Sequence, residues 1–243
     1  MSRSGEADDP RRRLLVQALA AGFFSGGVAG TDALAQILGK APSKLPPGRS
    51  IYRLSGEVMV DGKPATLDTK VGGRSTLETA RNSEIVYAVG QSAFILRGES
   101  RVVLETAQSD SLILTGLRLL SGKILSVFAA KRPMQLRAAT ATIGIRGTGV
   151  YMEADPEQTY FCTCYGVAQV TSTTDPESEE TVAAQHHDRP LYIVKGAPAG
   201  KNIREAPFIN HTDQELMLIE ALVGRTPPFI FPKGDYVGPR RNY

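Results

Sequence analysis

The sequence lacks most of the patterns that mark enzymes and nucleic-acid-binding proteins. Its 243 residues include no tryptophan, two cysteines and three histidines. It contains no phosphate-binding loop, no paired-carboxylate pattern and no Gly-x-Ser-x-Gly nucleophile elbow. The formal net charge is only +3 and basic residues are scattered beyond Arg13, so no basic surface for nucleic acid is predicted. We therefore expect a non-enzymatic protein that does not bind nucleic acid.

A long apolar run is also missing, although the N-terminal region resembles an export signal. A transmembrane helix needs about 20 apolar residues, and here Gln17, Ser25 and several glycines interrupt the apolar stretch. Arginines at 11–13 precede this stretch, which ends at a small-x-small site at 33–35. Paired arginines followed by x-Leu-Leu are typical of a twin-arginine signal. We expect residues 1–35 to be a signal peptide and the mature protein to be periplasmic, with membrane attachment only if the signal stays uncleaved.

Beyond the signal, the chain has the pattern of a mainly β protein. Residues 36–49 contain a Pro-rich stretch and are predicted to be a linker. Between residues 50 and 195, short segments of alternating apolar and polar residues are separated by turn residues about every ten positions. Asp61-Gly62 is a hairpin-turn pair. This spacing predicts many short strands, arranged as a sandwich, a roll or a short β-solenoid.

Residues 196–243 are predicted to form a C-terminal extension with one helix. Thr212 and Glu215 have the spacing of a capping box, in which the two side chains satisfy free backbone donors at a helix start. Apolar residues then recur at helical spacing up to a glycine, which predicts a helix at about 212–223. His211 is expected to pack at the start of this helix rather than to bind a ligand. The Pro-rich tail that follows is expected to lie extended on the body.

A short Gly-rich motif lies within the most regular of the predicted strands. Ile143 and Ile145 can face a core while the residues between them face away. The two glycines of the motif allow a tight or bulged corner that residues with a Cβ would resist. Its arginine is expected to cap backbone carbonyls rather than to bind an anion or a carboxylate, and we interpret the motif as fold-determining. Its residues are Arg146, Gly147, Thr148 and Gly149.

This motif, together with the predicted strand at 119–127, resembles the FecR-type family of periplasmic domains. The likeness covers roughly residues 50–195 and implies an exported β domain that serves in sensing or protein contact. Its partner would be an unknown periplasmic or envelope protein. The founding members relay a signal to a cytoplasmic sigma factor through an anti-sigma segment that precedes a membrane span. Only ten residues precede Arg11, and none is tryptophan, so we expect a stand-alone domain without the relay function.

Both cysteines and two of the three histidines form one candidate site for chemistry. Cys162 and Cys164 are two residues apart and project to the same face of a predicted strand. If the polar segment 173–180 closes a hairpin, His186 and His187 lie level with the cysteines. Two thiolates and one or both imidazoles could bind zinc in a tetrahedral site or the softer cuprous ion, and haem is a third candidate.

Three other interpretations of these residues stay open. An oxidising compartment would permit a disulfide, although cysteines two apart on a strand need a bulge for relaxed geometry. The thiols can equally be small buried residues, and the histidines a solvated strand end. A Cys164–His186 nucleophile pair oriented by Asp188 lacks a visible oxyanion site. The sequence thus favours a non-enzymatic sensing or binding module, with a metal- or haem-binding redox protein as the alternative.

Overall fold

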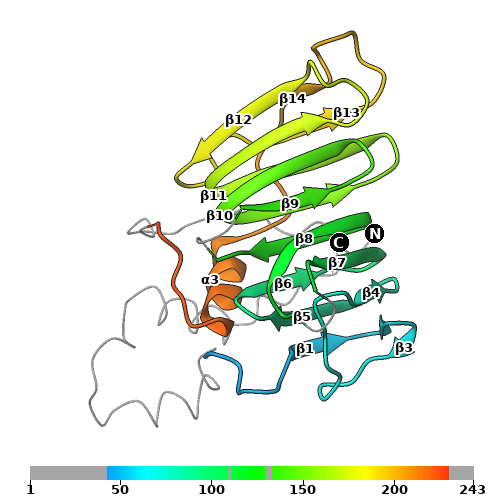
Figure 1. Cartoon of the computed structure of the whole chain (residues 1–243), viewed down its shortest axis with the longest axis vertical. Coiled ribbons are helices and arrows are strands. Elements are labelled where there is room, and N and C mark those ends of the chain that lie inside the picture. The colour runs from blue at the N-terminus through cyan, green and yellow to red at the C-terminus, as the bar shows by residue number, and fades with distance from the viewer. Residues whose placement is uncertain (1–42, 109–110, 130–132, 230–243) are drawn as a thin grey trace, which may run out of the picture.

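The computed structural model describes residues 43–108, 111–129 and 133–229 (Figure 1). The predicted signal peptide lies outside these ranges, as does the end of the Pro-rich tail. The described chain is mainly β, with its strands joined in one 14-stranded sheet and an α-helix near its C-terminal end. The prediction of a mainly β chain with a C-terminal helix is confirmed. Within the described ranges, no helix has both the length and the hydropathy needed to cross a membrane.

The three longest strands lie in the second half of the sheet. β8, β10 and β11 have 14, 14 and 15 residues. The elements are β1 (Ile51–Ser55), β2 (Val58–Val60), β3 (Lys63–Pro64), β4 (Thr76–Thr79), β5 (Glu84–Val89), β6 (Ser92–Leu96), β7 (Ser100–Thr106), β8 (Leu114–Val127), β9 (Pro133–Arg137), β10 (Ala141–Ala154), β11 (Gln158–Ser172), β12 (Glu179–Ala184), β13 (Leu191–Val194), β14 (Ile203–Glu205) and α3 (Asp213–Leu222).

The long strands change partners along their length. The first half of β8 pairs with β7 and β9, and its second half pairs with β6 and β10. The β8–β9 pair is parallel, and the other pairs of described strands are antiparallel. Gly122, where β8 changes partners, has a φ of +82°, and a Cβ there would lie 2.5 Å from the Cα of Ser100. The strands therefore stack along the long axis of the molecule and enclose a core (Figure 1).

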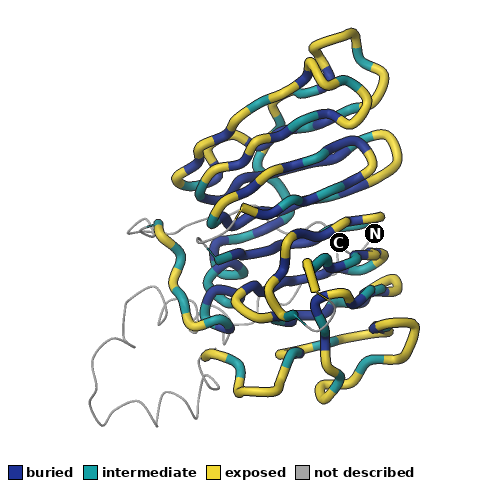
Figure 2. Tube along the Cα trace, in the orientation of Figure 1, coloured by how far each residue is buried: buried dark blue, intermediate teal, exposed yellow. Residues whose placement is uncertain are grey.

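Alternate residues of the strands belong to two separate apolar clusters. On β10, Val150 and Met152 belong to the larger cluster, and Tyr151 between them belongs to the smaller one. We call the larger cluster the inner core and the smaller cluster, on the opposite face of the strands, the outer core. Figure 2 shows buried residues along the strands and exposed residues at many of the turns. The outer core consists of Val86, Ala93, Ile95, Leu125, Val127, Tyr151, Tyr160, Cys162, Cys164, Tyr165, Leu216, Ile219 and Leu222.

Helix α3 packs on the outer core. The Thr212 side chain accepts a hydrogen bond from the Glu215 backbone, and the Glu215 side chain accepts one from the Thr212 backbone, so the capping box is formed. The apolar side of the helix presents Leu216, Ile219 and Leu222 to the sheet. Burial of each of these side chains stabilises the docked helix by about 1.5–3 kcal/mol. The outer core therefore depends on α3 for one of its two sides.

Arg97, at the end of β6, joins the sheet to the segment around α3. Its guanidinium donates hydrogen bonds to the Asn210 carbonyl at 2.8 Å and to the Glu215 carboxylate at 3.0 Å. It also lies 3.8 Å from the Glu84 carboxylate and 5.6 Å from the centre of the Tyr151 ring. Since a buried guanidinium is costly without such partners, these contacts fix where the helix begins.

The Gly-rich motif lies at a bulge in β10. The register between β10 and β11 shifts between Arg146 and Gly149, and Gly147 has a φ of +60°. A Cβ on Gly149 would lie 2.4 Å from the ring of Tyr165, so this glycine makes room for a side chain of the outer core. Arg146 is exposed and donates to no carbonyl in the described part of the chain, so the expected cap is not formed. Its place in the strand alternation directs it to solvent.

Candidate metal centre

Cys162 and Cys164 lie on the outer face of β11. Both are 0% exposed, and their thiols are not joined in a disulfide. The pairing of β11 with β10 skips Cys164, which is the extra residue of a β-bulge. Phe161, which precedes the first cysteine, faces the inner core on the other side of the strand. Both thiols therefore face the C-terminal part of the chain.

The hairpin of β11 and β12 brings His187 to the cysteines. β11 pairs with β12 from Thr171–Glu179 to Gly166–Ala184, so the polar segment between them is the hairpin loop that the sequence predicts. Beyond β12, the backbone N–H of His187 donates to the Cys164 carbonyl at 3.0 Å. His187 has a φ of +53°, a left-handed conformation that turns its side chain inward. Its Nδ1 lies 3.4 Å from the Cys162 Sγ.

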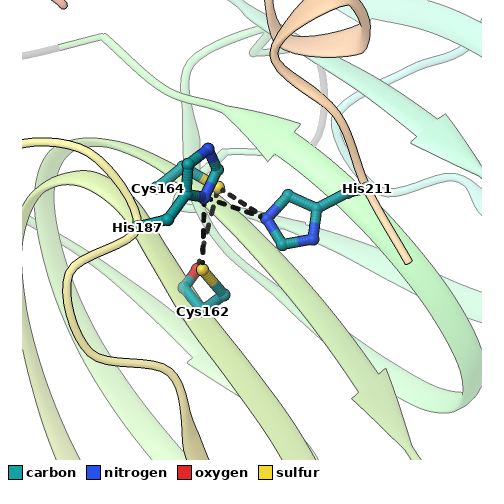
Figure 3. Close-up of side chains that lie close together, drawn as sticks. All are labelled: Cys162, Cys164, His187 and His211. Atoms are coloured by element: carbon teal, nitrogen blue, oxygen red, sulfur yellow. Dashed lines mark hydrogen bonds between the residues drawn. The ribbon is translucent and has the colours of Figure 1, made fainter. Parts of the chain in front are cut away.

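His211, which directly precedes the cap of α3, completes the cluster. Its Nε2 lies 3.4 Å from the Cys164 Sγ and 3.1 Å from the His187 Nδ1. The four potential ligand atoms all lie within 4.8 Å of one another, and Figure 3 shows the side chains converging from three separate segments. Ligands of a tetrahedral zinc ion lie roughly 3.3–3.8 Å apart, given bonds of about 2.0–2.3 Å. The metal-free spacing is therefore close to that of a bound ion. We call Cys162, Cys164, His187 and His211 the Cys/His cluster.

The remaining ring nitrogen of each clustered histidine is held by an oxygen acceptor. His187 Nε2 donates to the Asp213 carboxylate at 3.0 Å, and His211 Nδ1 donates to the Ile209 carbonyl at 2.7 Å. Because both acceptors are oxygens without a proton, the hydrogen of each neutral imidazole lies on the side away from the cluster. The lone pairs of His187 Nδ1 and His211 Nε2 then point into it. Carboxylates and carbonyls orient metal-binding histidines in the same way.

The protonation states of the cluster suit a cation. Burial opposes charge on Cys162, but hydrogen bonds from Cys164 and two histidine rings hold the pKa of its thiol well below the usual range. Burial and the neighbouring Cys162 raise the pKa of the Cys164 thiol well above it. Burial lowers the pKa of His187, but hydrogen bonds with Asp213 and Cys162 prevail and raise it to about 9. These shifts favour negative charge at Cys162 and a proton at His187, and a bound metal ion would take the place of that proton.

The structure brings together three of the four predicted ligands, and His186 is not the fourth. Its Nε2 lies 2.9 Å from the Asp213 carboxylate, outside the Cys/His cluster. Consecutive residues at a strand end point to different sides, and the left-handed turn at His187 gives that residue the inward place. The ring of Phe229 lies 4.6 Å from that of His186, between centroids, so the beginning of the Pro-rich tail lies against the site.

The nucleophile pair of Cys164 and His186 is not formed. Cys164 contacts His211 instead, and Asp188 accepts hydrogen bonds from the backbone of Gln185 and His186 rather than orienting an imidazole. A haem is also a poor fit to the cluster. Its axial ligands must stand on opposite faces of a wide slot, whereas these four donors converge on one point. The arrangement is that of a site for a single ion.

Sequence reasoning missed His211 as a member of the Cys/His cluster and Asp213 as the partner of His186 and His187. His211 does lie at the start of α3, as expected, but it also contacts Cys164 and His187. Asp213 is 0% exposed and accepts hydrogen bonds from both His186 and His187. Both residues lie next to the capping box in the sequence, and this position could have indicated that they belong to the site. A helix start is fixed in space by its cap, so side chains next to it are well-placed ligands.

Comparison with known proteins gives little beyond the fold. No family model matches the sequence, and no curated protein matches it. Two crystal structures of a candidate anti-sigma factor from Parabacteroides distasonis, at 2.50 and 1.65 Å resolution, superpose with a TM-score of 0.42 and 12% identity. The match covers 54% of this chain and only 58% of that protein. Likeness at this level establishes neither a family nor a function.

Proposed function

We propose that this protein is a non-enzymatic binding module that holds one zinc ion in the Cys/His cluster. Two thiols and two imidazoles are the ligand set of structural zinc sites. All four donors are buried, and their spacing matches a tetrahedral ion.

The observation that carries this proposal is the approach of two imidazole nitrogens. His187 Nδ1 and His211 Nε2 lie 3.1 Å apart, although each ring already donates its other N–H to an oxygen of Asp213 or Ile209. Two lone pairs at this distance repel each other unless a cation lies between them. A proton between the two nitrogens would relieve this repulsion for the histidine pair alone. A metal ion would relieve it for the pair and would bind both sulfurs as well.

The closed geometry supports a binding role rather than catalysis. Four protein ligands occupy all four positions of a tetrahedral ion, whereas catalytic zinc keeps one position for water or substrate. His187, at 8%, is the most exposed of the four ligands, so a substrate has no approach to the metal. Cuprous ion prefers the same soft sulfur ligands. Zinc fits better because tetrahedral S₂N₂ coordination is typical of it.

The resemblance to FecR-type domains supports a setting for this module. It favours export to the periplasm through the twin-arginine-like segment 1–35, and a sensing role exerted on another envelope protein. The Cys/His cluster suggests that the ligand of such a sensor is a zinc ion. The thiols would remain reduced in an oxidising compartment because bound zinc protects thiolates.

The test is elemental analysis combined with a thiol titration of the full chain, purified without chelator. We expect close to one zinc per chain and two thiols that react only after denaturation or chelation. The double variant Cys162→Ser/Cys164→Ser should lose the metal, because hydroxyls replace both thiolates. Cobalt substitution should give the intense thiolate-to-metal absorption of a tetrahedral site.

His186→Gln is the matched control, since it changes a neighbouring imidazole that is not a ligand. It should retain zinc at wild-type stoichiometry. Metal-free wild-type protein with freely reactive thiols would contradict the proposal. Zinc that persists in the double cysteine variant would place the ion elsewhere.

A further inference from the structure

The Cys/His cluster contains residues from two parts of the chain, the sheet and the segment that leads into α3. Cys162, Cys164 and His187 belong to β11 and to the loop after β12. His211 belongs to the segment that follows the last strand and leads into α3. We call residues 206–222 the C-terminal strap. A metal bound by all four residues therefore links the strap to the sheet through one ligand, His211.

The strap covers the thiols on the side away from β11. On one side of the thiols lies β11, with Phe161 and the inner core behind it. On the other side lie the Phe208 ring, 4.2 Å from the His187 ring between centroids, and His211 itself, which is 0% exposed. The inner core offers no path for a hydrated cation, because it is apolar and closely packed. Lifting of the strap would therefore expose both thiols to a metal ion.

Several hydrogen bonds hold the first part of the strap to the sheet. The Ala206 N–H donates to the Pro190 carbonyl at 2.9 Å. Tyr160 donates to the Pro207 carbonyl at 2.9 Å and accepts from the Ile209 N–H at 3.3 Å. Arg97 also donates to the Asn210 carbonyl at 2.8 Å, and the Asn210 side chain donates to the Glu153 carboxylate at 2.6 Å. A metal bond to His211 would add one further link to these contacts.

Lifting the strap also uncovers the outer core. His211 is followed at once by the cap Thr212 and the first turn of α3, so the position of its backbone is tied to the start of the helix. Beneath the helix lie the apolar side chains of β5, β6 and β8. They form a continuous surface of the kind that marks an interaction site when exposed. These residues are Val86, Ala93, Ile95, Leu125 and Val127.

We propose that zinc acts as a fastener for the C-terminal strap, so that occupancy of the Cys/His cluster sets how often the outer core is uncovered. This inference rests on the proposed zinc binding and gives it a structural output. With four ligands, the closed arrangement binds the metal far more tightly than the open one, which keeps three, and so zinc makes opening rarer by a factor that approaches one plus the ratio of free zinc to its dissociation constant. At free zinc 100 times that constant, opening becomes about 100-fold rarer.

Hydrogen–deuterium exchange of the full chain tests the inference. Zinc is first removed with a chelator and restored in steps, and bound metal is quantified in every sample. Amides of residues 206–222 should gain protection in proportion to free zinc, by about 100-fold at 100 times the dissociation constant. Amides of β2 to β4, residues 58–79, lie away from the cluster and serve as the internal reference, with little change expected.

His211→Gln separates the fastener from metal binding as such. This variant keeps three ligands and should still take up zinc, more weakly, while the zinc-dependent protection of the strap disappears. His186→Gln should retain both effects. A dye that reports exposed apolar surface should bind the zinc-free wild type more than the zinc-bound form.

The kinetics of metal loss provide a second, independent measurement. Release of zinc to excess chelator should reach a rate that no longer depends on chelator concentration, because opening of the strap limits it. A release rate that rises in proportion to chelator without limit would overturn the inference.

The outcomes also distinguish the two proposals. Wild type that binds zinc but shows equal exchange of residues 206–222 with and without metal overturns the fastener alone. Retained zinc-dependent protection in His211→Gln does the same. Failure of the wild type to bind zinc overturns the proposed function and the fastener with it.

Discussion

The inner and outer cores use opposite faces of the same strands, yet they differ in what completes them. The inner core is enclosed by the sheet and consists of apolar side chains such as those of Leu117 and Leu136. The outer core is covered by α3 and includes both cysteines. Strand pairing alone secures the first, whereas the second also needs a segment more than 20 residues further along the chain than Cys164. One sheet thus carries a core that its own strands enclose and a second core that α3 covers.

The largest expected effect comes from damage to the inner core. Leu117 on β8 is 0% exposed, and Leu117→Ala should destabilise the whole domain by about 2–5 kcal/mol, since the cavity cannot be refilled by the surrounding strands. Denaturant unfolding followed by circular dichroism measures this cost. The loss should be similar with and without zinc. If the free energy of unfolding lost in Leu117→Ala depended strongly on zinc, the inner core would depend on the metal as the outer core is proposed to do.

The same truncation in the outer core should act locally. Leu216 of α3 is also 0% exposed, and Leu216→Ala should weaken docking of the helix by about 2–5 kcal/mol. Because the inner core does not include this residue, the main unfolding transition of the sheet should shift less than in Leu117→Ala. Limited proteolysis should cut residues 206–222 first. Equal loss of both units would show that they unfold together.

A smaller effect is expected at the carboxylate behind His187. Asp213→Asn keeps the size of the side chain but removes the charge that orients two imidazoles. Loss of such a partner typically weakens metal affinity by 10–100-fold, or about 1.4–2.7 kcal/mol. Competition with a chelator of known affinity measures the change. Unchanged affinity would mean that the Asp213 contact serves only the helix start.

The smallest effect is expected at the helix cap. Thr212→Ala removes the hydroxyl that accepts the Glu215 N–H at 3.3 Å and should cost about 1 kcal/mol of docking stability. Thr212→Ser keeps the acceptor and should restore most of it. Hydrogen exchange of the first turn of α3 is the measurement. A serine variant as weak as the alanine variant would point to the lost methyl group instead.

Most of the fold follows from short-range patterns that the sequence displays. Asp61 and Gly62, with φ of +52° and +74°, form the turn between β2 and β3 that their sequence predicts. The capping box marks the start of α3 to the residue. The order of the strands in the sheet could not be predicted in this way, because β8 changes its pairing partners through contacts between distant segments. No local sequence pattern encodes that change.

The candidate site also combines residues that local patterns predict with residues that only contacts between distant segments bring together. Spacing by two places Cys162 and Cys164 on one face, and a hairpin loop brings the histidine pair level with them. The choice of His187 over His186 depends on a left-handed residue at the strand end, which propensity does not favour for histidine. His211 reaches the thiols only because α3 docks on the outer core. That docking is a tertiary event, and periodicity gives no sign of its direction.

The position of His211 has a consequence for how the protein is made. Ribosomes deliver the chain from its N-terminal end, so the two cysteines and His187 emerge with the sheet, and His211 follows after the last strand. The β body can collapse while the fourth ligand is still being synthesised. In the proposed centre, the full affinity for metal would therefore arise only after His211 has been synthesised and has joined the three earlier ligands.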